Sequence, residues 1–113
     1  MRRDVVLLAA TVAIALVFSV DGALRLARLE FHVLRFAVWG YPPWTVWAVS
    51  LAEIAGAFLL LWPGTFGAGV ALLGSVAAGF AGTHIVHGDG AVVAVPLAML
   101  AGVAGLALLA RRS

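Results

Sequence analysis

The sequence predicts an all-α fold, an integral membrane four-helix bundle with an amphipathic interfacial segment between helices 1 and 2. Hydrophobic residues make up 65% of the chain and charged residues only 11%, whereas a soluble domain carries about 25% charged residues. The apolar residues form four blocks, each close to the roughly 20 residues that cross about 30 Å of hydrocarbon. We therefore expect a single transmembrane domain over residues 1–113, with helices at about 5–26, 44–62, 66–87 and 91–110.

The first helix needs more than its apolar block to span a membrane. Residues 5–20 are apolar, and the helix becomes long enough when it continues through Asp21 to Leu26. A cleavable signal peptide is the alternative, because Arg2 and Arg3 precede the apolar run. No small-x-small cleavage site follows that run, which favours a membrane helix.

Prolines and small residues characterise the other three helices. The second begins after Pro43, which suits a first helical turn, and Pro63 and Gly64 stop it. The fourth contains Pro96, which a membrane helix tolerates because neighbouring groups satisfy the freed carbonyl. The third carries two rows of small residues, for which we expect close helix packing, with a homodimer contact as the alternative. The rows are Gly74, Ala78 and Gly82, and Gly67, Ala71, Ser75, Gly79 and Thr83.

Arginines at both ends of the chain predict its orientation. Four crossings place both ends on one side, and the pairs Arg2–Arg3 and Arg111–Arg112 mark that side as cytoplasmic. Arginines in the first connection oppose this assignment. We expect a multi-pass protein of the inner (cytoplasmic) membrane with the lipid bilayer as its surroundings and no nucleic-acid partner. Cysteine is absent from the sequence, so disulfides and thiol redox chemistry are excluded.

The first connection, residues 24–38, is amphipathic. Arg25, Arg28, His32 and Arg35 recur at spacings of three, four and three, which places them on one helical face. Such a segment rests in the headgroup layer with its arginines directed toward water or phosphate. Two interpretations remain open: the arginines only anchor the segment, or they form a site for an anionic lipid or a substrate.

Four aromatic residues follow this segment at one level of the membrane. They are Trp39, Tyr41, Trp44 and Trp47. Amphipathic rings favour the membrane interface, so an anchoring belt explains them. The same rings could instead line a site for a flat ligand.

The depths of the polar residues suggest a cavity that opens outward. At 1.5 Å of rise per residue, Glu53 lies about 13 Å below the aromatic level, near the midplane. Asp21, Arg25, His84 and His87 lie at the outer level on other helices. An intramembrane acid is a functional hypothesis by default, although Glu53 could simply hydrogen-bond a facing helix. The two histidines lack an evident third ligand, so we expect no metal site.

Four segments resemble the DoxX-like family of small four-helix membrane proteins. They are "GALRL", "WGYPPW", "LAEIAGAFLLLWPG" and "GTHIVHGDG", in this order, and the resemblance runs from about residue 18 to about residue 108. The family's Gly-x-x-Lys-Leu pattern corresponds to Gly22, Arg25 and Leu26. The resemblance therefore implies that Arg25 takes the place of the family's lysine. The family's glutamate, which small residues follow, corresponds to Glu53, Ala55 and Gly56. The family's Thr-His pair corresponds to Thr83 and His84. Asp21 departs from the small residue expected at its position.

The resemblance implies a membrane subunit of a quinone-reducing or related oxidoreductase system. No haem-binding histidine pair, flavin motif or nucleotide-binding glycine motif is present in the sequence, so a quinone is the cofactor that the resemblance leaves open. The expected function is binding of a quinone or another hydrophobic small molecule, beside a protein partner subunit or as a homodimer. The expected ligand-binding residues are Arg25, His87, Trp39, Tyr41, Trp44, Trp47 and Thr83.

The buried acids also favour an alternative function, that of a membrane enzyme. A small membrane isomerase, cyclase or epoxide-opening enzyme needs an acid and a base beside an apolar, isoprenoid-like substrate. Glu53, Asp21 and His84 would then be catalytic, with an acid donating the proton and His84 accepting one. A transporter is less favoured, because neither broken helices nor repeated halves are evident in the sequence.

Overall fold

The computed structural model describes residues 2–88 and 90–112, and these residues form helices and connections without any strand. In chain order the elements are α1 (Arg2–Ala27), α2 (Leu29–Val38), α3 (Trp44–Leu60), the 3₁₀ turn η1 (Pro63–Thr65), α4 (Phe66–Val86), the 3₁₀ turn η2 (Gly90–Val93) and α5 (Ala94–Arg112). Three stretches are long and apolar enough to cross a membrane: Asp4–Ala27, Pro63–Val86 and Ala94–Arg111; Trp44–Leu60 is a shorter apolar helix. The prediction of an all-α membrane protein is confirmed.

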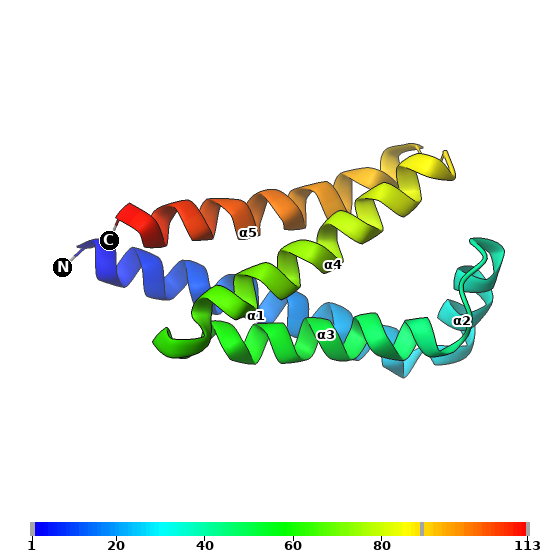
Figure 1. Ribbon diagram of the computed structural model, residues 1–113, viewed down its shortest axis with the longest axis horizontal. Helices are drawn as coiled ribbons and strands as arrows, with labels where there is room; N and C mark the ends of the chain where they lie inside the picture. The colour runs from blue at the N-terminus through cyan, green and yellow to red at the C-terminus, as the bar shows by residue number, and fades with distance from the viewer. Residues whose placement is uncertain (1, 89, 113) are drawn as a thin grey trace.

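The long helices lie side by side in an order that follows the chain. α1 packs along α3, α3 along α4 and α4 along α5, while α1 and α5 contact each other much less. Figure 1 shows that α1 begins and α5 ends at the same end of the molecule. α2 lies at the opposite end and runs steeply across the direction of the long helices (Figure 1).

Prolines and a short turn set helix ends that differ from the expected ones. α3 ends at Leu60, two residues before the expected end, because Trp62 takes an extended backbone (φ −120°, ψ 138°). Extended backbone is what a residue before proline prefers, and Pro63 follows. α5 begins at Ala94 rather than at residue 91, because the preceding residues form the turn η2.

Glycines outside the expected rows allow the closest helix contacts. A Cβ atom on Gly22 would lie 2.7 Å from the backbone oxygen of Ser50, and one on Gly69 would lie 2.9 Å from that of Gly56. By contrast, Cβ atoms on Gly67, Gly79 and Gly82 would meet open space. The prediction that both rows of small residues mediate close packing within the chain is therefore wrong for these three glycines.

The core lies between α1, α3, α4 and α5. Its buried side chains are Ala15, Phe18, Ala57, Leu60, Leu73, Ala77, Val103 and Leu106. The contact at Gly22 holds α1 against α3 just above this core. One helical turn later, Arg25 is thereby brought within reach of α3, and the polar site begins there.

Candidate functional site

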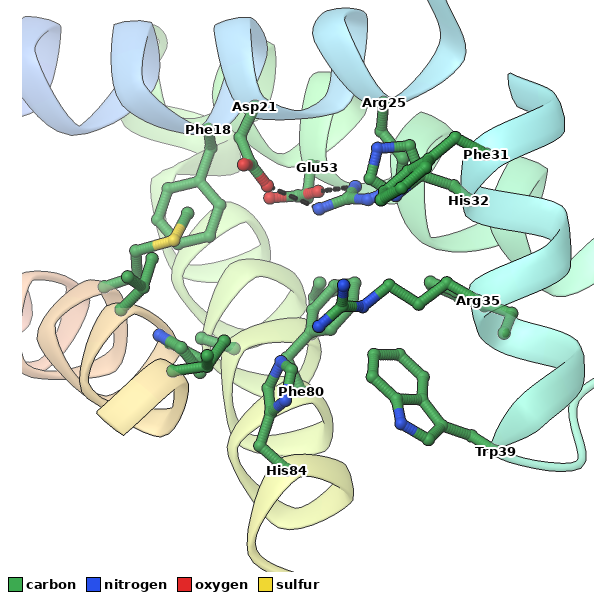
Figure 2. Close-up of a pocket in the computed structure, with 17 residues that line it drawn as sticks. Phe18, Asp21, Arg25, Phe31, His32, Arg35, Trp39, Glu53, Phe80 and His84 are labelled. Carbon is green, nitrogen blue, oxygen red and sulfur yellow. Dashed lines mark hydrogen bonds and ion pairs between the residues drawn. The ribbon is translucent and has the colours of Figure 1, made fainter. Parts of the chain in front are cut away.

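A buried arginine links two carboxylates across the interface of α1 and α3. Arg25 donates through Nη2 to Oδ2 of Asp21, one turn earlier on α1, at 2.5 Å. Through Nη1 it pairs with Glu53 on α3 and donates to Oγ of Ser50 at 3.2 Å. Figure 2 shows both carboxyl groups on the same side of the guanidinium. We call Asp21, Arg25 and Glu53 the polar cluster.

Two members of the polar cluster are buried, and both are paired. Glu53 is 1% exposed and Arg25 is 7% exposed. The guanidinium carbon of Arg25 also lies 4.7 Å from the ring centre of Phe80 on α4, a cation–π distance. In the part of the chain that the structure describes, every buried side-chain nitrogen and oxygen has a hydrogen-bond partner. Glu53 therefore has an interhelical partner, as the packing interpretation of this residue requires.

The polar cluster also faces a cavity of about 440 Å³. This volume lies within the range of small-molecule sites, about 300–1,000 Å³. Residues from all five α-helices line it, and the ionisable ones among them are Asp21, Arg25, His32, Arg35, Glu53 and His84. The remaining walls are aromatic and aliphatic, and include Phe18, Phe80, Val95 and Met99. A mostly apolar cavity with a few polar groups at one end suits an amphiphilic ligand.

α2 covers one end of this cavity through contacts with α4. The ring of Trp39 meets the ring of His84 edge to face, with centres 5.1 Å apart and an interplanar angle of 85°. The Tyr41 hydroxyl and the Thr83 hydroxyl are 3.0 Å apart, within hydrogen-bond distance. Phe36 and Phe80 also meet edge to face, at 6.0 Å. These contacts hold α2 across the bundle in the position that Figure 2 shows.

His32 and Arg35 bring two basic side chains of α2 to the cavity. Partial burial, and then the positive charges of Arg25 and Arg28, lower the pKa of His32 below its ordinary value. The His32 ring is therefore neutral at neutral pH. Arg35 extends from α2 toward α4, and its guanidinium carbon lies 5.7 Å from the ring centre of Trp39.

The structure brings together five of the ten candidate residues. Asp21, Arg25, Trp39, Glu53 and His84 line the cavity. Tyr41 and Thr83 line a neighbouring cavity of about 320 Å³ that shares Phe36, Trp39, Val76 and Phe80 with the first.

Trp44, Trp47 and His87 line neither of these two cavities. Both tryptophans are exposed, at 67% and 46%, as an interfacial anchor would be. The Nδ1 atom of His87 lies 2.8 Å from the carbonyl oxygen of Thr83, so this ring bonds the end of its own helix.

The basic face expected on residues 24–38 reaches the cavity in part, because Arg25, His32 and Arg35 line it. The sequence left a site for an anionic lipid or a substrate open as one interpretation of this face, and the spacing of the basic residues from Arg25 is its signal. Arg28 belongs to the same spacing, yet it marks the break between α1 and α2 and lies outside the cavity, over the ring of Phe31. Apolar lining residues such as Phe18 and Met99 carry no signal in helices that are apolar throughout.

The sequence model of the DoxX-like family matches residues 9–106. No curated protein and no solved structure matches the chain. The family match includes all five helices apart from the outer ends of α1 and α5.

Proposed function

The chain belongs to the DoxX-like family of membrane proteins, and on that premise we propose that it binds a hydrophobic ligand with one polar end, such as a quinone. One observation carries the proposal. The polar cluster and His84 face the same cavity of about 440 Å³, and its other walls are apolar. Helix packing alone accounts for the pairing of Arg25 with Glu53, but it does not require a cavity beside them.

The lining residues suggest how such a ligand lies. A flat ring fits between aromatic side chains, with Phe80 and Trp39 on the walls. A carbonyl oxygen of the ring can accept hydrogen bonds from Arg25, or from His84 when its ring nitrogen carries the proton. Val95 and Met99 line the cavity on α5, and Val95 is exposed at the surface, so an apolar tail would lie along them and reach the bilayer.

The proposal includes the membrane topology and a partner. Both termini are cytoplasmic, which places the cavity in the outer half of the inner membrane. The chain then acts as a ligand-binding subunit beside an oxidoreductase, as the family resemblance implies. A reporter enzyme fused after Ser113 should be active only in the cytoplasm, and activity in the periplasm would contradict this orientation.

Quenching of tryptophan fluorescence by a short-chain quinone tests the binding site in detergent-purified protein. His84→Ala should weaken binding about tenfold, or about 1.4 kcal/mol, the scale of one hydrogen bond lost in a desolvated site. Glu53→Gln should weaken it to a similar extent, because it removes the ion-pair partner that positions the Arg25 donor. Glu30→Gln is the matched control for Glu53→Gln, because Glu30 does not line the cavity. Equal quenching in the parent and in all three variants would mean that the quinone only partitions into the micelle.

A second function is supported by the placement of acids and a histidine on different walls. Figure 2 shows Asp21 and Glu53 on one side of the cavity and His84 on the other. A protonated carboxyl could donate its proton to an epoxide oxygen, and His84 could remove a proton from the carbon skeleton after the ring opens. Conversion of an isoprenoid epoxide, followed by mass spectrometry, tests this reaction. Loss of turnover in Glu53→Gln with retained ligand binding would favour the enzyme, and no product from the parent would exclude it for that substrate.

A further inference from the structure

Among the described residues that line the cavity, Arg35 is an arginine without a carboxylate partner. Arg25 has two carboxylate partners, Asp21 and Glu53. Among the residues that the structure describes, no carboxylate lies within ion-pair distance of Arg35, and its contact is with the ring of Trp39 at 5.7 Å. Because His32 is neutral at neutral pH, Arg35 supplies the positive charge of the α2 wall.

The position of Arg35 differs from that of a lipid anchor. An anchoring arginine extends toward water or lipid phosphate. Arg28, two turns earlier in this segment, lies outside the cavity over the ring of Phe31, at 5.3 Å. Arg35 instead lines the cavity and extends from α2 toward Phe80 and His84 (Figure 2). The same segment therefore holds two exposed arginines, of which Arg35 lines the cavity and Arg28 does not.

The chemistry of guanidinium indicates what Arg35 would bind. Its planar fork of N–H donors matches the oxygens of a carboxylate, a phosphate or another anionic group. Arg35 is itself exposed, so the geometric match of its donors, rather than burial of the pair, would select the anion. The carboxylates of the polar cluster belong to α1 and α3, so an anion at Arg35 would lie on the α2 side of the cavity.

We propose that the ligand of this cavity is an acidic amphiphile, whose ionised oxygen binds Arg35 and whose apolar part lies against Phe18, Val95 and Met99. This inference rests on the proposed binding function and narrows its ligand class. An alkylated hydroxyquinone, with an acidic ring hydroxyl, has this chemistry, and so does a free fatty acid. A neutral quinone lacks the ionised oxygen.

Two matched probes separate acid recognition from general binding. They are 2-hydroxy-3-decyl-1,4-naphthoquinone, which is ionised at neutral pH, and 2-methyl-3-decyl-1,4-naphthoquinone, which is neutral. In tryptophan quenching, the parent should bind the acidic probe about tenfold more tightly, the scale of a hydrogen bond between charged groups. Arg35→Gln should remove this preference by weakening only the acidic probe. Arg28→Gln removes the same charge from the same segment and should leave the preference unchanged.

The outcomes distinguish this inference from the proposed function. Equal affinity of the parent for both probes, or a preference that survives in Arg35→Gln, would overturn the inference and leave neutral ligand binding intact. Failure of both probes to bind would overturn the binding function as well. Competition between decanoic acid and the acidic probe shows which kind of ligand supplies the acidic oxygen. Displacement that depends on Arg35 points to a fatty acid, and no displacement points to the acidic quinone ring.

Discussion

Arg25→Met should lower the free energy of unfolding by about 3–5 kcal/mol, the cost of leaving a buried ion without its partner. Glu53 is 1% exposed, and its ion pair is with Arg25. Asp21 also loses its pair, but its side chain is 39% exposed, so water can solvate it. The polar cluster thus makes Arg25 the residue on which the contact between α1 and α3 depends most.

Equilibrium unfolding in mixed detergent micelles measures this effect. Arg28→Met is the matched control and should change the free energy by less than about 0.5 kcal/mol, because Arg28 is exposed and lies outside the cluster. The double variant Arg25→Met with Glu53→Gln should regain part of the loss, because it removes the unpaired charge. Unfolding of Arg25→Met at the same detergent composition as the parent would show that the cluster does not hold these helices together.

Val95→Trp should abolish ligand binding by filling the apolar end of the cavity. Val95, Pro96 and Met99 line the cavity on one face of α5, whereas Leu97 does not line it. Because an indole takes up space that the ligand needs, we expect affinity to fall at least about a hundredfold, or about 2.7 kcal/mol. Equilibrium dialysis with a short-chain quinone is the suitable measurement, since an added tryptophan would alter the fluorescence.

Leu97→Trp adds the same side chain to the same helix and should leave affinity within about twofold of the parent. Leu97 does not line the cavity, so a larger side chain there should not enter the space that the ligand occupies. Retained binding in Val95→Trp, or equal loss in both variants, would contradict the position of the cavity. Thermal unfolding of both variants checks that neither has lost its fold.

The helices could be predicted from the sequence because their lengths and hydropathy are determined by the bilayer. Each apolar block is about long enough to span the hydrocarbon core, and prolines mark several of the block ends. The fixed rise per residue also gives each residue a depth. That is why Asp21, Arg25, Glu53 and His84 were assigned compatible depths before the structure related them to one cavity.

The direction in which each residue faces could not be predicted in the same way. Small residues occur on several faces of α4, so the sequence does not indicate that Gly69 makes the close contact while Gly79 and Gly82 meet open space. The break at Arg28 contains neither glycine nor proline, and it turns α2 across the bundle. The place of Arg35 in the cavity depends on that turn and on the contact of Trp39 with His84, both of which are tertiary.

A crystal structure grown from a lipidic mesophase with a short-chain quinone would test most directly whether the cavity binds such a ligand. We expect density for a flat ring between the polar cluster and His84, with the tail leaving past Val95 and Met99. A cavity closed by repacked side chains, with quinone found only on the lipid-facing surface, would contradict the proposed function.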